Sequence, residues 1–353
     1  MARKLETAGG RGRLRALVEV EDSPIRRSSL NLGKVWAEWR PTASLPTLRR
    51  RAELMGRVRK FFAERNVLEV EVPVLQGGAN IDPGVQPFVV KTPHGIRYLP
   101  TSPEHPMKRL VAAEYGPVWT IAPAFRSDEK GRRHAPEFRM LEWYRPGWDD
   151  WKLLREVLSL FDTLTGLGTT HEVLGYRKAF EQFVGIDPAT VPNTELIKLL
   201  GDQASVATLP NGNIDRTVAF DLLLTERIEP HLGKGHWTVM TDYPVHVAAQ
   251  ARLRADEDDR PVAARFEIYR DGIELANGYW ELTDASELAG RLETEQAKRT
   301  GVSLLERDVR FEAAMLHGLP ECAGVAVGFD RLVMLALGLG SVSETQAFAA
   351  GNE

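Results

Sequence analysis

The sequence has one cysteine, no long apolar run and little net charge, and each shortage excludes a class of protein. Cys322 is alone among 353 residues, so no intramolecular disulfide can form, as expected in a reducing compartment such as the cytoplasm. No stretch has the roughly 20 apolar residues that a membrane-spanning helix needs, and the N-terminus lacks a signal-peptide pattern. The formal net charge of -4 argues against a nucleic-acid-binding surface over the whole chain.

The N-terminal 40 residues differ in composition from the rest. They carry nine Lys or Arg against five Asp or Glu and show little hydrophobic periodicity. Residues 1–40 are therefore predicted to be a disordered basic leader, with an arm that contacts RNA or an acidic protein as the alternative. Because the apolar share of 43% is ordinary for a globular protein, residues 41–353 are predicted to form a folded domain.

The most informative stretch runs from residue 118 to residue 145. Two β-rich runs, 118–126 and 137–145, flank a polar, basic loop and predict a hairpin. Alternation in the second run places Phe138, Met140, Glu142 and Tyr144 on one face. An aromatic ring, a carboxylate and a phenol beside a basic loop indicate a site for a flat base, a polyphosphate and an amine. A half-buried hairpin with a charged tip is the alternative.

A second hairpin is predicted over 265–281, because Asp-Gly at 271–272 lies between β-rich runs. This turn would pair Tyr269 with Glu274 and Glu267 with Ala276, which puts both glutamates on one face. Two such close carboxylates repel unless a cation lies between them, and Mg²⁺ prefers this kind of pair. Two solvated glutamates on an exposed sheet face are the alternative.

Other stretches predict packing elements. Apolar residues at steps of four and three predict an amphipathic helix over 48–62, and alternation predicts a half-buried strand over 68–72 that ends at Pro73. Residues 151–265 are predicted to be mainly helical, with loops at 208–213 and 232–236.

The last block, 324–337, predicts a strand that ends at Gly328 and then an apolar helix. Arg331 lies at the start of this helix. A cation is unfavourable there unless an anion is bound.

These stretches together resemble the class II aminoacyl-tRNA synthetases, in the version of lysyl-tRNA synthetases and, more closely, of their short paralogues, the elongation factor P lysine ligases. FRSDE…HAPEFRMLEWY, residues 125–144, resembles motif 2. GVAVGFDR, residues 324–331, resembles motif 3, and the helix–strand unit before Pro73 resembles motif 1, the dimer interface. The resemblance covers roughly 42–348 and implies an α+β catalytic domain with an antiparallel sheet flanked by helices.

The resemblance also implies which residues bind ATP and Mg²⁺. Arg126 would hold the α-phosphate and Arg331 the γ-phosphate, so both are candidate catalytic residues. Phe138 would stack on adenine, and Gly328 would let the adenosine approach the backbone. The remaining candidate nucleotide contacts are Ser127, Asp128, His134, Ala135, Glu274 and Leu275. Glu267 and Glu274 are the candidate Mg²⁺ ligands.

A further set is implied to bind a lysine-like amino acid. The TSPE segment would contact its α-amino end through Ser102, Pro103 and Glu104, although Ser102-Pro103 is also a helix-start signal and Glu104 could serve in capping. The side-chain ammonium would be held by Glu142, Tyr144 and Glu281, with Asn277 and Ala326 completing the site. Ala326 stands where lysyl-tRNA synthetases have Gly, as in the ligase subfamily.

The function implied is ATP-dependent ligation of lysine or (R)-β-lysine to a lysine side chain of elongation factor P, by a cytoplasmic homodimer. Acylation of tRNA is not expected, because residues 1–40 cannot build an anticodon-reading barrel. Two alternatives stay open: a truncated synthetase that charges tRNA or a small acceptor, and a catalytically silent paralogue. Asp128, Ala135 and Trp280 depart from the family pattern, and they bear on substrate choice.

Overall fold

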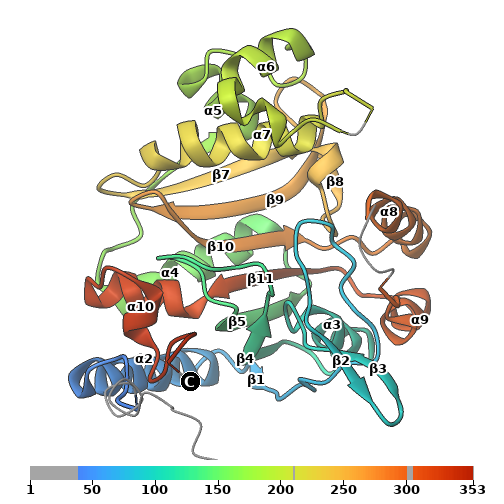
Figure 1. The fold of residues 1–353 in the computed structure, drawn as a ribbon. Coiled ribbons are helices and arrows are strands. Elements are labelled where there is room, and N and C mark those ends of the chain that lie inside the picture. The colour runs from blue at the N-terminus through green and yellow to red at the C-terminus, as the bar shows by residue number, and fades with distance from the viewer. Residues whose placement is uncertain (1–38, 210, 300–304, 353) are drawn as a thin grey trace, which may run out of the picture. The chain divides into compact units, whose positions relative to one another are not determined.

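The computed structural model describes residues 39–209, 211–299 and 305–352. By the contacts between its residues, the chain divides into two units, 1–40 and 41–353. The predicted basic leader therefore lies almost entirely outside the described residues. All elements below belong to the unit 41–353 (Figure 1). None of the helices in the described part of the chain is long and apolar enough to cross a membrane.

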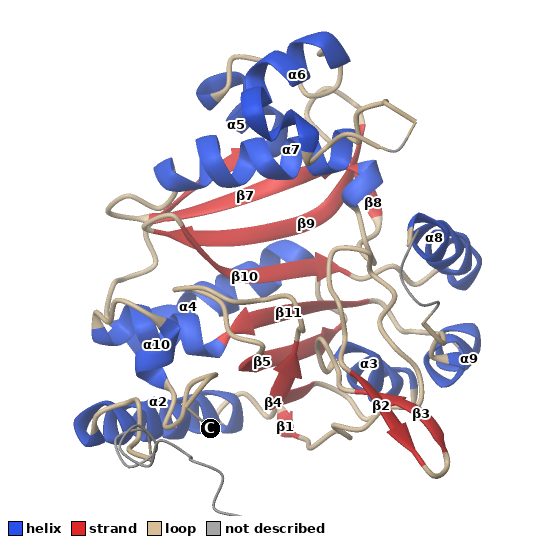
Figure 2. Cartoon of the chain, in the orientation of Figure 1, coloured by secondary structure: helices blue, strands red, loops and turns tan. Residues whose placement is uncertain are grey.

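A nine-stranded sheet forms the centre of this unit, counted over the described residues (Figures 1 and 2). The order is β1-β4-β5-β11-β10-β9-β7-β6, with β8 on β9, and neighbours are antiparallel except β1–β4 and β6–β7. The strands are β1 Leu68–Glu69, β4 Val118–Phe125, β5 Glu137–Pro146, β6 His171–Gly175, β7 Trp237–Pro244, β8 Leu253–Ala255, β9 Pro261–Arg270, β10 Ile273–Trp280 and β11 Cys322–Gly328. A separate hairpin pairs β2 Val89–Thr92 with β3 Gly95–Tyr98. The α+β class with a largely antiparallel sheet is thus confirmed.

Helices cover both faces of the sheet (Figure 2). They are α2 Leu45–Ala63, α3 Glu104–Ala112, α4 Asp150–Thr165, α5 Tyr176–Phe183, α6 Asn193–Leu200, α7 Arg216–Leu223, α8 Ala285–Lys298, α9 Val309–His317 and α10 Phe329–Leu337. A π-helical turn, Leu224–Ile228, follows α7, and 3₁₀ turns span Gly201–Ser205, Glu229–His231, Val245–Val247 and Val342–Thr345.

On one face, α2, α4 and α10 pack over the centre of the sheet. Helix α4 begins where the Asp149 side chain accepts a hydrogen bond from the Lys152 amide and ends at Gly166, whose φ is 71°. Its apolar stripe, with Leu153, Val157 and Phe161, belongs to the same buried cluster as strand residues from β5, β7, β9, β10 and β11. Hydrophobic burial on this face holds the strands that carry the site.

On the opposite face, two separate groups of helices leave the middle of the sheet open. Helices α5, α6 and α7 share a core with β7 and β9 at one end. Helices α3, α8 and α9 share another core with β4, β5 and β11 at the other end. The candidate site lies between these two cores.

The motif 1 strand is shorter than predicted. The helix is confirmed, but only Leu68 and Glu69 pair with β4 as β1, instead of the predicted 68–72. Leu68 is 51% exposed, whereas Val70 and Val72 are partly buried against the core of α3, α8 and α9, so the predicted alternation in burial fails at Leu68 only. The physical reason is its position at the edge of the sheet, where pairing with one neighbour ends after Val70 donates to the Trp119 carbonyl.

The prediction that 151–265 is mainly helical missed the strands of this segment. The segment holds four helices, but also β6, β7, β8 and the start of β9. Strand β7 is covered on both faces, and its first five residues are all buried. A strand buried on both faces lacks the polar–apolar alternation that distinguishes a strand from a buried helix. The predicted loop at 232–236 is present, as is the described part of the one predicted at 208–213, residues 208–209 and 211–213.

Candidate functional site

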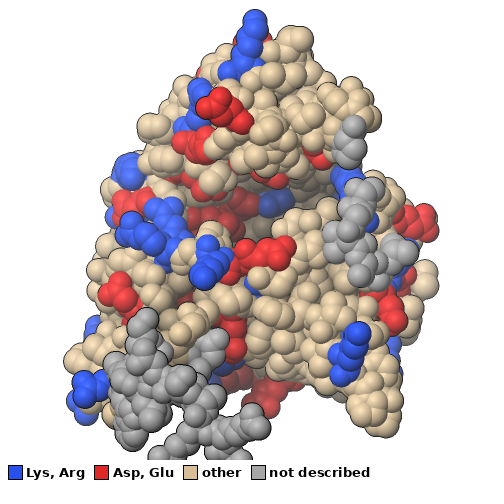
Figure 3. Space-filling view, viewed as in Figure 1, with Lys and Arg blue, Asp and Glu red and all other residues tan. Residues whose placement is uncertain are grey.

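Strands β4 and β5 form the predicted hairpin, with Phe125 opposite Glu137 and Ala124 opposite Phe138. The alternation in β5 places Met140, Glu142 and Tyr144 in the wall of a cavity of about 310 Å³. We call it the acidic cavity, because five glutamates line it: Glu104, Glu142, Glu267, Glu274 and Glu281. Figure 3 shows acidic side chains gathered in the hollow of this face, with basic side chains at its edge.

A β-bulge shapes the wall that β10 contributes. The turn at 271–272 has both φ angles positive, as a type I′ hairpin requires, and Glu274 pairs with Tyr269 as predicted. The register then shifts, so Glu267 faces Asn277 and not the predicted Ala276. Without the extra residue, Glu274 and Asn277 would point to opposite faces; with it, both line the acidic cavity.

A second, smaller cavity of about 60 Å³ adjoins the first, and the two share Arg126, Met140 and Gly328 in their walls. We call it the arginine cavity after Arg126, Arg133 and Arg331. Here the guanidinium carbon of Arg126 lies 5.2 Å from the centre of the Phe138 ring. Its Nη1 lies 2.8 Å from the Glu129 carboxylate.

Arg331 lies in the first turn of α10 and is fixed by backbone acceptors. It donates to the carbonyl of Arg133 at 3.0 Å and to that of Glu274 at 2.9 Å. Its Nη2 is 2.6 Å from His134 Nε2. Burial and then the charge of Arg331 lower the pKa of His134, so its neutral ring accepts this hydrogen bond. Three arginines, Arg126, Arg133 and Arg331, thus line the arginine cavity, and guanidinium groups are suited to binding a polyphosphate.

The opposite end of the acidic cavity is suited to an ammonium group. The Tyr144 hydroxyl donates to Glu142 Oε1 at 2.7 Å, and Glu142 Oε2 is buried without a hydrogen-bond partner. Burial, and then the charge of Glu104, raise the pKa of Glu142 to about 8. Burial likewise raises the pKa of Glu281 to about 7. An ammonium ion here would favour both carboxylates in their ionised form.

The two predicted Mg²⁺ ligands lie in the same wall but differ in their environment. Glu267 accepts hydrogen bonds from the hydroxyls of Tyr243 and Tyr269, both at 2.5 Å, and pairs with Arg265. Glu274 is half-buried, and burial followed by the charge of Glu267 raises its pKa. Among the described residues, no group of three or more His, Cys, Asp or Glu could hold a metal alone.

This donor set nevertheless fits Mg²⁺. A carboxylate has about four lone-pair sites, so three protein donors leave Glu267 roughly one for a metal. Mg²⁺ is usually held by one or two carboxylates together with substrate phosphates and water. Burial and then the charge of Glu267 raise the pKa of Glu274, and a cation shared by the two carboxylates would favour the ionised form.

Most of the predicted site residues come together in these two cavities. The acidic cavity contains Ser102, Glu104, Arg126, Glu142, Tyr144, Glu267, Glu274, Leu275, Asn277, Glu281, Ala326 and Gly328. The arginine cavity contains Arg126, His134, Ala135, Phe138, Gly328 and Arg331. Pro103, Ser127 and Asp128, although the structure describes them, lie outside both walls.

The residues outside the walls have visible local roles. Pro103 is the N-cap residue of α3, and Ser102 Oγ accepts a hydrogen bond from the Glu104 amide at 3.1 Å. The helix-start prediction and the cavity prediction therefore both apply to this segment. Ser127 donates to Asp128 at 3.0 Å on an exposed turn.

The sequence analysis did not predict several residues that lie in or behind the wall of the acidic cavity. They are Asn80, Asp82, Val85, Thr101, Arg265, Tyr279, Gly324 and Val325 in the wall, and Lys108 behind it. Lys108 had a detectable signal, since it lies four residues after Glu104 on a predicted helix, the spacing of an ion pair. Asn80 and Asp82 had none, because they reach the site from a loop between β1 and β2.

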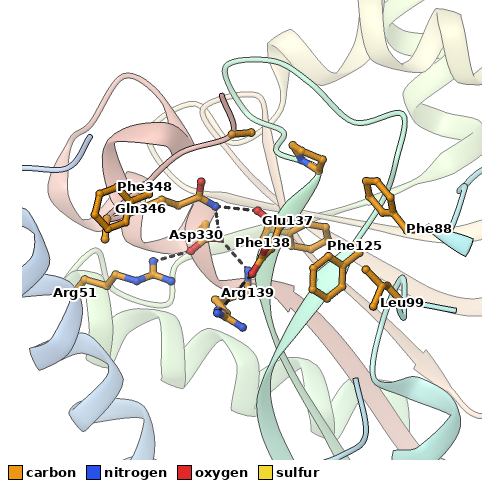
Figure 4. A pocket seen from close by; sticks show the side chains of 13 residues that line it. Arg51, Phe88, Leu99, Phe125, Glu137, Phe138, Arg139, Asp330, Gln346 and Phe348 are labelled. Atoms are coloured by element: carbon orange, nitrogen blue, oxygen red, sulfur yellow. Dashed lines mark hydrogen bonds and ion pairs between the residues drawn. The ribbon is translucent and has the colours of Figure 1, made fainter. Parts of the chain in front are cut away.

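Asp330 joins elements of all three motifs beside the site. Its side chain pairs with Arg51 of α2 at 2.6 Å and accepts from the Arg139 amide of β5 at 2.9 Å, while Asp330 itself belongs to α10. Figure 4 shows these contacts, with Gln346 also directed at Asp330. Arg51, Arg139, Asp330 and Gln346 line an outer cavity of about 570 Å³, and Phe138 also lies in its wall.

The fold and the two cavities are those expected of a class II synthetase catalytic domain, and comparison with known proteins agrees. Residues 28–352 match the family described as tRNA synthetases class II (D, K and N). This match covers far more than half of the chain.

Comparison with individual curated proteins identifies a smaller group within this family. The chain is 43% identical to the elongation factor P–(R)-β-lysine ligase of Salmonella gallinarum, over 88% of this chain and 97% of the relative. The proteins of the same name from Salmonella dublin and Salmonella typhimurium are each 42% identical, with the same coverage. The chain therefore belongs to the class II tRNA synthetase family and, within it, to the group of elongation factor P–(R)-β-lysine ligases.

Proposed function

We propose that the protein is an ATP-dependent ligase that attaches a lysine-like amino acid, (R)-β-lysine or lysine, to a lysine side chain of elongation factor P. One observation carries the proposal: guanidinium groups for a polyphosphate and carboxylates for an ammonium lie in two cavities that share Arg126. The substrate and the acceptor come from the names of relatives that are 42–43% identical.

In the first step, a carboxylate oxygen of the amino acid attacks the α-phosphorus of ATP, and pyrophosphate leaves. Arg126 neutralises charge on the α-phosphoryl group, and Arg331 holds the leaving phosphates, so catalysis comes from positioning and charge. In the second step, an uncharged lysine amine of elongation factor P attacks the carbonyl of the aminoacyl adenylate, and AMP leaves. No side-chain nucleophile of this protein is required.

Mg²⁺, held by Glu274 and Glu267 when bound, would supply further neutralisation of phosphate charge. The arginine cavity of about 60 Å³ is too small to hold a whole nucleotide, so ATP would also occupy the cavities that adjoin it. The Arg126–Glu129 pair and the Arg331–His134 contact lie in the wall of the arginine cavity. ATP phosphates would take the place of Glu129 and His134 as partners of the two guanidinium groups.

We further infer a cytoplasmic homodimer through α2 and β1, the unit that resembles motif 1. The observation in support is a group of apolar side chains that the described chain leaves exposed near this edge, including Leu68 (51%) and Leu75 (48%). Such exposure beside an edge strand favours burial against a second copy.

The test is amino-acid-dependent exchange of labelled pyrophosphate into ATP, followed by mass spectrometry of elongation factor P. Arg126→Ala and Arg331→Ala should each lower exchange by about 10²- to 10³-fold, as for lost transition-state charge stabilisation. Arg155→Ala, which removes an exposed arginine of α4 from the opposite face, is the matched control. Exchange at the wild-type rate in either cavity variant would refute the assignment.

A further inference from the structure

Lys108 is a buried lysine just outside the acidic cavity. It lies on α3, and its side chain is only 1% exposed. Its Nζ is 2.8 Å from Glu104, 2.6 Å from Glu281 and 2.9 Å from the Gln250 side-chain oxygen that accepts from it. The contacts with Glu104 and Gln250 are hydrogen bonds, and the contact with Glu281 is an ion pair.

Lys108 is also charged. Burial alone would lower its pKa, but the charges of Glu104 and Glu281 outweigh burial and raise it above its ordinary value. Burial would raise the pKa of Glu104, yet the charges of Lys108 and His105 outweigh burial and lower it. The ammonium therefore remains a cation between two carboxylates that come from different parts of the fold.

Those two carboxylates both line the acidic cavity. Glu104 opens α3, and Glu281 directly follows β10, so no shared element fixes the distance between them. Each directs one oxygen to Lys108. The other oxygen of Glu281 packs closely against Gly324. If Gly324 had a side chain, its Cβ would lie 2.4 Å from this oxygen and 2.3 Å from the Tyr144 ring.

We propose that Lys108 is a positioning residue that sets the spacing between the carboxylates receiving the two amines of the substrate, and thereby selects among amino acids by the separation of those amines. This inference rests on the proposed function. (R)-β-Lysine and lysine are isomers, but the amine on the β-carbon lies one carbon–carbon bond closer to the distal amine. A fixed spacing of the acidic groups matches one isomer better than the other.

The two isomers differ in amine separation by one carbon–carbon bond, so the expected effect is that of a mismatch of one methylene between substrate and pocket. Such a mismatch in a shaped pocket changes kcat/KM by about 10- to 200-fold. A structural role for Lys108 alone would affect both isomers equally. A spacing role affects the ratio between them.

The experiment measures kcat and KM for (R)-β-lysine and for lysine at pH 8 by pyrophosphate exchange, in wild type, Lys108→Met and Lys60→Met. Methionine keeps the apolar stem of Lys108 and removes its charge. Lys60 is the matched control, because it is an exposed lysine of α2 with only a distant pair to Glu64 at 3.8 Å.

In Lys108→Met, we expect the ratio of kcat/KM between the isomers to fall from about 10- to 200-fold to within about threefold, mainly through KM. The KM for ATP and all constants of Lys60→Met should stay unchanged. An unchanged ratio in a folded Lys108→Met protein would overturn the proposal. Exchange with neither isomer in wild type would instead refute the proposed function.

If Lys108→Met does not fold, Gln250→Leu carries the test. This variant removes one acceptor from the ammonium and leaves both carboxylates and the lysine in place. The isomer ratio should fall by severalfold, with the KM for ATP unchanged. A wild-type ratio in Gln250→Leu would equally overturn the proposal.

Discussion

Binding of the amino acid should release a proton from Glu142. This carboxyl is buried, and burial followed by the charge of Glu104 raises its pKa to about 8. The other groups that face it are the Tyr144 hydroxyl, which donates to it, the cation of Lys108 and the carboxyl of Glu281. A substrate ammonium favours the ionised form, so affinity rises with pH until Glu142 is ionised without ligand.

The magnitude follows from the pKa. At pH 7, one unit below about 8, roughly one Glu142 in ten is ionised in the empty site, and ionising it costs about 1.4 kcal/mol. The KM for the amino acid should therefore be about tenfold higher at pH 7 than on its alkaline plateau. Glu281, with its pKa raised to about 7, adds a smaller rise below neutral pH.

The assay is pyrophosphate exchange from pH 6.5 to 8.5, with calorimetry in two buffers of different ionisation enthalpy to count protons. Glu142→Gln keeps the acceptor for the Tyr144 hydroxyl but cannot ionise. It should abolish the tenfold change between neutral and alkaline pH, while the KM for ATP keeps its own pH dependence. Proton uptake on binding, or an unchanged pH profile in the variant, would refute the reasoning.

Three further outcomes are expected. Glu281→Gln should raise the KM for the lysine-like amino acid by about 10- to 150-fold, because a charge-assisted hydrogen bond contributes about 1.5–3 kcal/mol. ATP binding should stay near normal. Loss of ATP binding in this variant would instead make Glu281 a metal ligand. Asp330→Ala should lower the free energy of unfolding by about 3 kcal/mol, since it leaves Arg51 without its 2.6 Å partner, as denaturant titration would show against wild type. Light scattering at micromolar concentration should give the mass of a dimer, and a fully active monomer would contradict the proposed interface.

The motif segments could be predicted from sequence because their signals are local. A strand, a turn and a strand are contiguous over 118–145 and 265–281. Alternation placed Glu142 with Tyr144 on one face, and the pairing set by the turn did the same for Glu267 and Glu274; all four line the acidic cavity. Arg331 was recognisable as a cation in the first turn of a helix. These features depend on spacing along the chain and little else.

The rest depends on tertiary context that spacing does not encode. Strand β7 was missed because it is buried on both faces and so lacks alternation. The bulge in β10 was missed because an extra residue is visible only against the partner strand. Lys108 gave a surface-like pairing signal, and only the fold shows that Glu281 and Gln250, more than 140 residues away, enclose it.

The bulge in β10 has a consequence for how this protein can vary. Deletions of one residue are usually tolerated best at loop tips, and Leu275 lies only three residues beyond the tip of its hairpin. Deleting Leu275 would restore a regular ladder. Either Glu274, or the cavity residues after the bulge (Asn277, Tyr279 and Glu281), would then point away from the cavity. We therefore expect the number of residues between Gly272 and Glu281 to tolerate no insertion or deletion, even where individual side chains can be exchanged.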